Sequence, residues 1–343
     1  MLLYNFVQIG CIQISPCAKW DREGITLLGT GIAGNSSKEL NEPVGISFYE
    51  PTNSLYIADY KNARIQMILL NESSGNAVTV VTHLFFPRHI YVDNDNDQPT
   101  IYVTLSAQNR VEKWISRASK GLQIGNECQK CVGIALDKDK NVYICDTTRE
   151  QILKWSPYTN ETTIRAGVTD HDGKDPNLLS TPQGIYVTKT GDDIYIADTG
   201  NSRIQRWSKD AVQGMTVAGS SAGIAGNDSA SLRNPIGVFV DETTNVIYIA
   251  DTYNNQIKRW LPNAIHGDVI AGIGGQGVGP DELNVPTDLT FDNNGNLLVS
   301  DFKNNRIQLF RLIDNKLCSA SDRNIIHRMI LSLLTLWIIV KFM

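Results

Sequence analysis

The sequence predicts an all-β fold, a six-bladed β-propeller of four-stranded blades, and two observations support this prediction. Nearly the same segment recurs six times, most clearly at residues 194–207 and 246–260. One position of it recurs at spacings of 46, 41, 52, 53 and 50 residues, between short apolar runs cut by Asn, Asp and Gly. This pattern is typical of propeller blades rather than of a helical solenoid. The repeated position holds Asp59, Leu105, Asp146, Asp198, Asp251 and Asp301, where Leu105 marks a degenerate second copy.

Each repeat contains four strand signals in a fixed order. The first is an apolar run after a proline or its substitute, and we expect it to form the innermost strand. An Asp, Asn and Gly turn leads to a second strand that is apolar on both faces, as expected where neighbouring blades cover each sheet. The third strand ends in a basic residue and Trp, and the fourth precedes a glycine, as in residues 215–219. The innermost runs begin at Pro43, Pro87, Cys131, Pro182, Pro235 and Pro286, and the tryptophans are Trp114, Trp155, Trp207 and Trp260.

The last repeat lacks a fourth strand after residues 306–310, but residues 24–29 have the sequence of one. We therefore expect this N-terminal segment to complete the sixth blade and remove an exposed sheet edge. Residues 19 and 20 look like an additional packed segment. The predicted organisation is an N-terminal segment (1–23), the propeller (24–317), a small and polar spacer (318–328) and a hydrophobic tail (329–343).

The turn between the second and third strands reads Tyr-Ile-Ala-Asp, followed by Asn and then Arg-Ile-Gln in its best copies. This pattern resembles the NHL repeat over roughly residues 24 to 313. It is specific in the first, fourth, fifth and sixth copies, weaker in the third and eroded in the second. The resemblance implies a six-bladed propeller used mostly to bind proteins, sometimes to bind RNA, and occasionally adapted as an enzyme.

The net charge of −5 comes from 31 basic and 36 acidic residues. This balance gives no general attraction for phosphate backbones, so we expect no nucleic-acid partner.

Asparagine and cysteine usage favours an extracellular location. Four glycosylation sequons fall in polar stretches between or after outer strands, at Asn35, Asn71, Asn160 and Asn227. The six cysteines are Cys11, Cys17, Cys128, Cys131, Cys145 and Cys318, and they are disulfide candidates. We expect Cys145 to be oxidised, because it lies opposite the strand that begins at Cys131. Free buried thiols are the alternative, as is a zinc half-site at the Cys-x-x-Cys of residues 128–131, which lacks a second ligand pair.

The C-terminal tail predicts attachment to the extracellular face of the membrane. Residues 329–340 are almost wholly apolar and follow a polar spacer and the small residues 319–321. This order suits a GPI signal with Ser319 as the lipid-attachment candidate. A single spanning helix is the alternative, although spanning takes about 20 residues, and a packed C-terminal helix is a third interpretation. An N-terminal signal peptide is not evident.

The sequence predicts no catalytic, cofactor-binding or metal-binding site. A residue present in nearly every copy is best explained by the scaffold, so the repeated aspartates are expected to accept backbone N–H groups at turns. We expect the tryptophans to pack between blades. His89 replaces a glycine of an innermost strand and is a candidate for the central channel. Residues 93–97 imitate the start of a calcium loop but lack its Gly and distal Glu, so a solvated turn is expected.

The sequence therefore predicts a non-enzymatic scaffold that binds a protein or another extracellular ligand. The predicted partner-binding residues are Tyr60, Lys61, Tyr253, Phe302 and Lys303, on the turns of three blades that ring closure makes consecutive. One alternative is a propeller enzyme resembling peptidyl-hydroxyglycine amidating lyase or a calcium-dependent lactonase. Another is a cytosolic NHL adaptor of the type associated with ubiquitin ligases.

Overall fold

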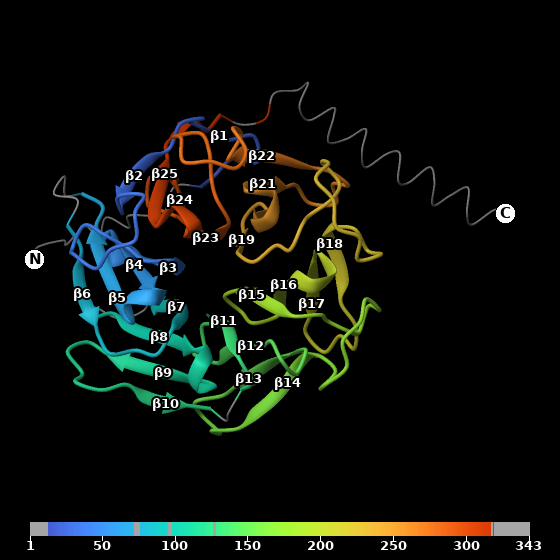
Figure 1. Ribbon diagram of the computed structural model, residues 1–343. Helices are drawn as coiled ribbons and strands as arrows, with labels where there is room; N and C mark the ends of the chain where they lie inside the picture. Colours follow the sequence, from blue (N-terminus) through green and yellow to red (C-terminus); the bar gives the residue numbers. More distant parts are fainter. Residues whose placement is uncertain (1–12, 72–75, 95–97, 126–127, 317, 319–343) are drawn as a thin grey trace, which may run out of the picture.

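The chain folds into six four-stranded antiparallel sheets arranged around a central channel (Figure 1). This computed structural model describes residues 13–71, 76–94, 98–125, 128–316 and residue 318. The innermost strand of every sheet borders the channel, and each sheet packs its faces against the two neighbouring sheets. The predicted six-bladed propeller is confirmed.

Within each blade the strands follow one another from the innermost outward. The first three blades are β3 (Pro43–Tyr49), β4 (Ser54–Asp59), β5 (Arg64–Leu69) and β6 (Val78–Val81); β7 (Pro87–Asp93), β8 (Thr100–Leu105), β9 (Arg110–Ile115) and β10 (Leu122–Ile124); and β11 (Cys131–Leu136), β12 (Val142–Asp146), β13 (Gln151–Trp155) and β14 (Thr162–Gly167). The others are β15 (Pro182–Val187), β16 (Asp193–Asp198), β17 (Arg203–Ser208) and β18 (Met215–Gly219); β19 (Val238–Asp241), β20 (Val246–Asp251), β21 (Gln256–Trp260) and β22 (Gly267–Ala271); and β23 (Pro286–Phe291), β24 (Leu297–Asp301), β25 (Arg306–Phe310) and β2 (Ile25–Leu28).

Short 3-10 turns connect second and third strands on one side of the ring, which we call the turn face. They are η2 (Tyr60–Asn62), η3 (Ser106–Gln108), η4 (Thr199–Asn201), η5 (Thr252–Asn254) and η6 (Phe302–Asn304), and η1 (Glu50–Thr52) lies on the opposite face. Each turn of the turn face ends in a residue with left-handed backbone. In η3, η5 and η6 that residue is an asparagine, Asn109, Asn255 or Asn305, and asparagine tolerates this conformation.

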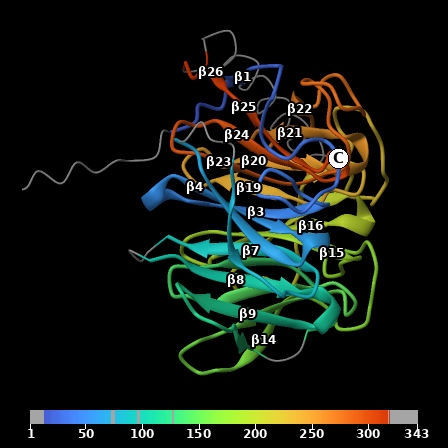
Figure 2. The ribbon, with the colours of Figure 1, turned by 60° about the vertical axis from the view of Figure 1, so that its left-hand side comes forward.

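The sixth blade is completed by the N-terminal segment, as predicted. β2 pairs with β25, with Ile25 opposite Leu309 and Leu28 opposite Ile307. Beyond this sheet, β1 (Lys19–Trp20) pairs with β26 (Leu312–Asp314), and a disulfide joins Cys17 to Cys318 (Figure 2). Residues 19 and 20, which the sequence predicts as an additional packed segment, thus join the two ends of the ring a second time.

Trp20 explains why this additional closure packs firmly. The indole is 7% exposed and lies against Tyr248 and Phe291, which belong to two different blades. Its Nε1 donates a hydrogen bond to the Gly295 carbonyl at 2.9 Å. One side chain therefore joins the N-terminal segment to the fifth and sixth blades.

A buried aspartate fastens five of the six blades to the loop that precedes them. In the fourth blade, Asp198 accepts the Ser180 backbone N–H through Oδ1 at 2.7 Å, and Oδ2 accepts Asn201 and Arg203 at 2.9 and 2.7 Å. The carboxylate has no exposed surface. We call this arrangement the aspartate clasp, and it recurs at Asp59, Asp146, Asp251 and Asp301. These residues accept backbone N–H groups, as predicted, but the N–H groups belong to the loop before the blade rather than to the turn.

A buried apolar residue lies directly before the amide that each clasp holds. Leu179 has this place before Ser180 and shows no exposed surface. The same position holds Leu40, Leu84, Cys128, Leu179, Leu232 and Leu283 in the six blades, and three residues later the innermost run begins with proline or Cys131. The Cys128–Cys131 disulfide therefore occupies the place of a leucine and a proline.

The structure corrects the expected oxidation of Cys145, which is a free, buried cysteine. Its expected partner strand begins at Cys131, and Cys131 bonds to Cys128 instead. The Cys145 sulfur faces Gly133, so that a Cβ on this glycine would approach it to 2.9 Å. Burial raises the pKa of the Cys145 thiol well above its ordinary value, and the thiol is an apolar core group. Cys11 lies outside the described residues.

The tryptophan predictions hold best where the repeat is best preserved. Trp207 and Trp260 are 1% exposed and belong to cores shared between blades. Trp114 and Trp155 are half-buried. The weaker repeats thus also have the less complete inter-blade packing.

We expect Leu28→Ala to lower the free energy of unfolding by about 2 to 5 kcal/mol, because it removes a fully buried side chain from the closing strand. The control is Ile25→Ala on the same strand, whose side chain is 41% exposed and which should change stability by less than about 1 kcal/mol. Chemical denaturation measures both. Equal effects of the two variants would contradict closure through β2.

Candidate functional site

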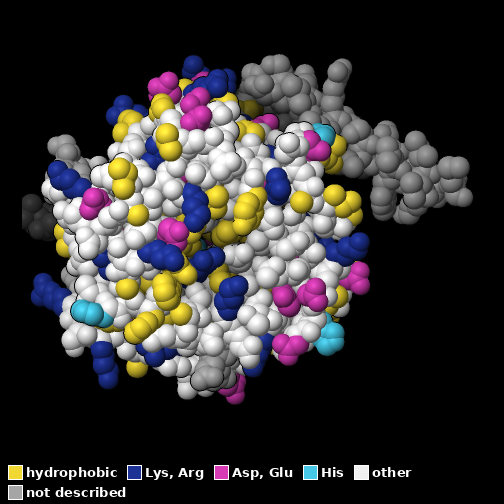
Figure 3. Space-filling view, in the orientation of Figure 1, with side chains coloured by type: hydrophobic (Ala, Val, Ile, Leu, Met, Phe, Trp, Pro, Cys, Tyr) yellow, Lys and Arg dark blue, Asp and Glu magenta, His cyan; other side chains and the backbone are white. Residues whose placement is uncertain are grey.

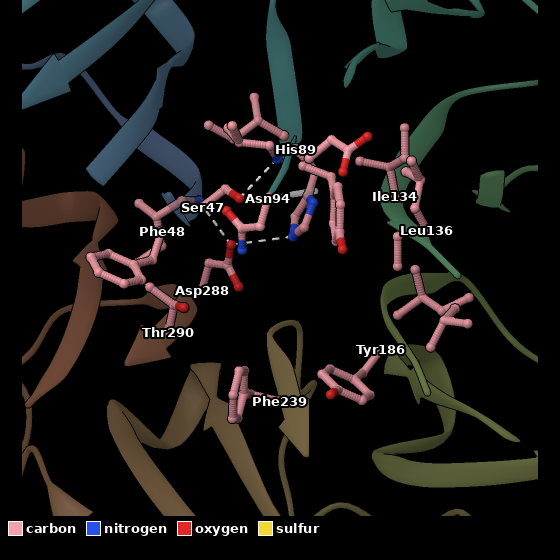
Figure 4. Close-up of a pocket in the computed structure, with 18 of the residues that line it drawn as sticks. Ser47, Phe48, His89, Asn94, Ile134, Leu136, Tyr186, Phe239, Asp288 and Thr290 are labelled. Carbon is pink, nitrogen blue, oxygen red and sulfur yellow. Dashed lines mark hydrogen bonds and ion pairs between the residues drawn. The ribbon is translucent and has the colours of Figure 1, made fainter. Parts of the chain in front are cut away.

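The channel holds a cavity of about 470 Å³ that is lined by the innermost strands of all six blades (Figure 4). Its lining residues include the ends of these strands and the turns after them, so the cavity extends to the face opposite the turn face. Because six equivalent strands surround it, any chemistry in the channel depends on where the blades differ from one another.

The clearest difference is a histidine and an aspartate at one equivalent position. The third residue of the innermost run is glycine in four blades, at Gly45, Gly133, Gly184 and Gly237. In the second and sixth blades it is His89 and Asp288, and their side chains meet, with Nε2 and Oδ2 separated by 3.2 Å. The intervening blade has Gly45, where a Cβ would lie 2.7 Å from the His89 Cα. The glycine leaves room for the pair.

Backbone groups fix the aspartate of this pair. Asp288 Oδ2 also accepts the Ile46 N–H at 2.8 Å, so one carboxylate oxygen joins the sixth blade to the first and the second. With the proton on Nε2, His89 donates to Asp288 and Nδ1 is left as an acceptor. Nδ1 is buried and has no partner among the described residues. The structure thus places His89 in the channel, as the sequence suggested.

Aromatic side chains line the channel beside the pair. Tyr91, Tyr186 and Phe239 are each the fifth residue of their innermost runs, and the ring centroids of Tyr186 and Phe239 lie 5.5 Å apart. The Tyr186 hydroxyl donates to Glu242 at 3.0 Å. Burial, and then the nearby Glu242 carboxylate, raise the pKa of Tyr186 well above its ordinary value, so the phenol stays protonated.

Charged residues surround the mouth of the channel on the opposite face. Lys140 Nζ lies 2.7 Å from Asp93 Oδ1, and Glu50, Asp137 and Lys189 also line the cavity. Asp93 therefore pairs with a lysine of the third blade, while residues 95–97 lie outside the described residues. Among the residues that the structure describes, no group of three or more His, Cys, Asp and Glu side chains is placed to hold a metal ion. The channel can hold a small molecule between aromatic rings and an imidazole–carboxylate pair.

The predicted partner-binding residues lie on the turn face, and several meet there. Lys61 and Lys303 both pair with Glu42, at 3.8 and 2.9 Å, which brings the first and sixth blades together. Tyr60 packs on Phe86 with ring centroids 5.1 Å apart, and Lys303 lies 4.6 Å from the ring centroid of Phe302. Figure 3 shows hydrophobic and cationic side chains gathered around the centre of the ring.

Arg88 joins these residues across the turn-face end of the channel. It comes from the second blade, donates to Gln183 of the fourth blade at 3.1 Å, and lies 5.8 Å from the Tyr60 ring centroid. Burial lowers the pKa of Arg88, and the nearby Tyr60, Glu42 and Tyr253 oppose this effect. We call the resulting surface the central patch. It consists of Glu42, Tyr60, Lys61, Phe86, Arg88, Tyr253, Phe302 and Lys303.

Sequence reasoning missed Asp288, Phe86 and Arg88. Aligning the six innermost runs would have found Asp288, because it replaces the same glycine as His89. Phe86 and Arg88 flank Pro87, after a connection shorter than those before the fourth to sixth blades. Their convergence with Tyr60 and Gln183 depends on how blades meet around the ring, and no local pattern indicates it.

All four sequon asparagines, Asn35, Asn71, Asn160 and Asn227, are exposed. The lipid-attachment candidate Ser319 and the hydrophobic tail lie outside the described residues. No helix in the described part of the chain has the length and hydrophobicity needed to cross a membrane.

Comparison with known proteins identifies the repeat. The NHL repeat model matches residues 179–207 and 283–310, in the fourth and sixth blades. NHL repeat-containing protein 2 of Gallus gallus is 35% identical over 109 residues, which cover 31% of this chain and 15% of that protein. NHL repeat-containing protein 3 of Homo sapiens is 28% identical over 145 residues, covering 38% of this chain and 40% of that protein. The matched regions thus span less than half of these relatives.

Solved structures share the fold at low sequence identity. An auxiliary nutrient binding protein from Bacteroides thetaiotaomicron has a TM-score of 0.66 at 18% identity, over 85% of this chain and 76% of that one. A gluconolactonase from Xanthomonas campestris has a TM-score of 0.59 at 11% identity, over 88% and 98%. A streptogramin B lyase has a TM-score of 0.55 at 14% identity, over 84% and 97%. This chain is an NHL-repeat six-bladed β-propeller.

We expect Asp288→Ala to lower the free energy of unfolding by about 1 to 3 kcal/mol, because the buried Ile46 N–H loses its acceptor. Asp288→Asn keeps an acceptor oxygen for this N–H and should lower the free energy of unfolding by less. Urea denaturation of the two variants measures the difference. If the alanine variant is as stable as the original protein, the carboxylate does not hold the three blades together.

Proposed function

We propose that this NHL-repeat propeller is a non-enzymatic scaffold that binds a protein partner through the central patch of its turn face. The observation that carries the proposal is the grouping of aromatic and cationic side chains from several blades around one end of the channel. Aromatic and arginine residues dominate the energetics of protein interfaces. A rigid ring of strands loses little conformational freedom when such a surface is covered.

The chemistry of the patch defines the partner. Tyr253 is 56% exposed and Phe86 is 41% exposed, so apolar ring surface is available for burial. The side chains of Lys61 and Lys303 are 46% and 48% exposed, and one carboxylate, Glu42, offsets both. We therefore expect a partner segment that combines an acidic residue with apolar side chains.

We further propose that the protein works outside the cell, attached to its surface. The two disulfides suit an oxidising compartment, and the exposed sequons leave room for glycans. The fold similarity to an auxiliary nutrient binding protein is in keeping with a surface role. Attachment would depend on the C-terminal tail.

A second candidate function is binding or conversion of a small molecule in the channel. The His89–Asp288 pair favours it, because a positioned imidazole beside a carboxylate can transfer a proton. Lyase and gluconolactonase chemistry occurs among proteins of similar fold. Under this function, replacing His89 abolishes ligand binding while the central patch stays intact.

A partner is first identified by cross-linking on the native cell surface and then purified. We expect the double variant Tyr253→Ala, Lys303→Glu to weaken the affinity for this partner by at least about tenfold, roughly 1.4 kcal/mol. Two controls are His89→Ala in the channel and Tyr158→Ala, an aromatic side chain that is 80% exposed elsewhere on the surface. Calorimetry measures the affinities. Full affinity of the double variant would place the interface away from the central patch.

For the location, we expect the mature protein from its native cell to carry glycans on the sequons. An alkylating agent should modify the four disulfide cysteines, Cys17, Cys318, Cys128 and Cys131, only after reduction. It should modify Cys145 as soon as the protein is unfolded, without a reductant. Peptide mass mapping checks both statements. An unglycosylated protein whose thiols all react without reductant would contradict an extracellular location.

A further inference from the structure

In four blades, the loop before the blade is held through its main-chain carbonyls by two polar side chains. The first is the asparagine three residues after the clasp aspartate. In the first blade Asn62 donates to the Gly34 carbonyl at 2.7 Å, and in the fourth Asn201 donates to the Gly173 carbonyl at 2.7 Å. Asn254 and Asn304 make the same bond to their own loops.

The second loop-binding group is a cation that follows the asparagine. Arg64 donates to the carbonyls of Asn35, Ser36 and Glu39, and Arg306 to those of Val278, Gly279 and Glu282, at 2.7 to 3.0 Å. Arg203 has equivalent bonds in the fourth blade. In the fifth blade Gln256 holds the position of the arginine, and Lys258, two residues later, makes the bonds to the loop. Each loop closes on itself, as where the Gly34 N–H donates to the Leu40 carbonyl, and it is bound through backbone oxygens, independently of its side chains.

The second blade keeps both loop-binding groups but has no such loop. Gln108 stands at the asparagine position and Arg110 at the cation position. Only residues 82–86 connect β6 to β7, whereas residues 29–42, 168–181 and 272–285 make the equivalent connections at other blades. The space that a loop fills elsewhere is here a cavity of about 540 Å³.

Both groups line this cavity, which we call the junction pocket. Gln108 Oε1 and Arg110 Nε are buried and have no hydrogen-bond partner in the described part of the chain. Nε lacks the acceptor that the clasp aspartate supplies to Arg64, Arg203 and Arg306, because Leu105 stands in its place. Arg110 also pairs with Glu112, whose other oxygen accepts the Trp114 Nε1 at 3.0 Å. Buried polar groups without partners are rare in folded proteins, because each one costs free energy until a partner satisfies it.

The third blade provides an internal contrast. Its preceding connection, residues 125–130, is also short, but Gln151 replaces the cation. Gln151 is satisfied by its own blade, since it donates to Asp146 at 3.0 Å and accepts from Thr169 at 2.6 Å. A blade with a short preceding connection therefore need not keep a cation at this position. The second blade has both the short connection and the retained Arg110.

We propose that the junction pocket binds a short peptide loop of a partner protein, in the place that the loops of this chain take at other blades. Arg110 donates to its backbone carbonyls, and the Gln108 amide can both donate to and accept from one peptide unit. Glu112 already balances the Arg110 charge, so the ligand is a neutral peptide backbone rather than a carboxylate or phosphate. Phe85, which is 59% exposed, offers apolar surface to its side chains. The pocket is separate from the central patch.

The test uses the loops of this chain as probes, because they already satisfy the same groups. Fluorescently labelled peptides of residues 30–40, 168–178, 221–231 and 274–283 are titrated with the full chain, and polarisation is measured. We expect at least one to bind at millimolar concentration or tighter, and Arg110→Gln, which copies the residue of the third blade, to weaken it at least tenfold. Gln108→Ala should weaken it at least threefold.

Two further variants make the result specific. In the first variant, residues 29–39 replace residues 82 and 83, and Leu105→Asp restores the clasp aspartate, so that the chain supplies its own loop to the pocket. This variant should no longer bind the peptides, and its melting temperature should rise. Tyr253→Ala, in the central patch, should leave peptide binding to the junction pocket unchanged. A failure of this proposal can therefore be distinguished from a failure of the proposed function. Absence of binding for all four peptides, or equal binding to Arg110→Gln, would overturn the proposal even if the loop variant does not fold.

Discussion

The aspartate clasp is the interaction on which most of this ring depends. One buried carboxylate takes a backbone N–H from the loop before its blade and side-chain donors from the turn after its second strand. It thereby fixes the spacing between loop, innermost strand and turn, and sets the buried leucine beside the preceding blade. A carboxylate without exposed surface is tolerable only because nearly every lone pair is used. In the second blade, where Leu105 replaces it, the preceding connection is short and Trp114 is half-buried.

The two ends of the channel differ because innermost strands start at one face and end at the other. At the turn face, Arg88 crosses from the second to the fourth blade and is surrounded by aromatic rings and lysines. On the opposite face, the strands end in acidic residues and lysines around a cavity that reaches the His89–Asp288 pair. One molecule can therefore present a macromolecular surface on one side and a small-molecule pocket on the other.

The fold and its closure were predictable because repetition multiplies weak local signals. The period, the strand order and the closing segment at residues 24–29 all followed from the sequence, and His89 was found as a departure from symmetry. Cys145 was predicted wrongly, because strand proximity cannot show that Cys131 has a nearer partner three residues away. The convergence of Arg88, Tyr60 and Gln183, and the junction pocket, depend on the packing between blades, which a single chain pattern does not encode.

The double closure at the sixth blade constrains how the protein can be made. The Cys17–Cys318 bond joins residues 301 positions apart, and β2 cannot pair until β25 has been synthesised. During synthesis on the ribosome, the first five sheets can therefore form in order while β2 remains unpaired. Such a late, long-range pairing slows the final step of folding. Until then the growing chain exposes two complementary sheet edges, so its neighbours on a polysome are potential partners for strand exchange.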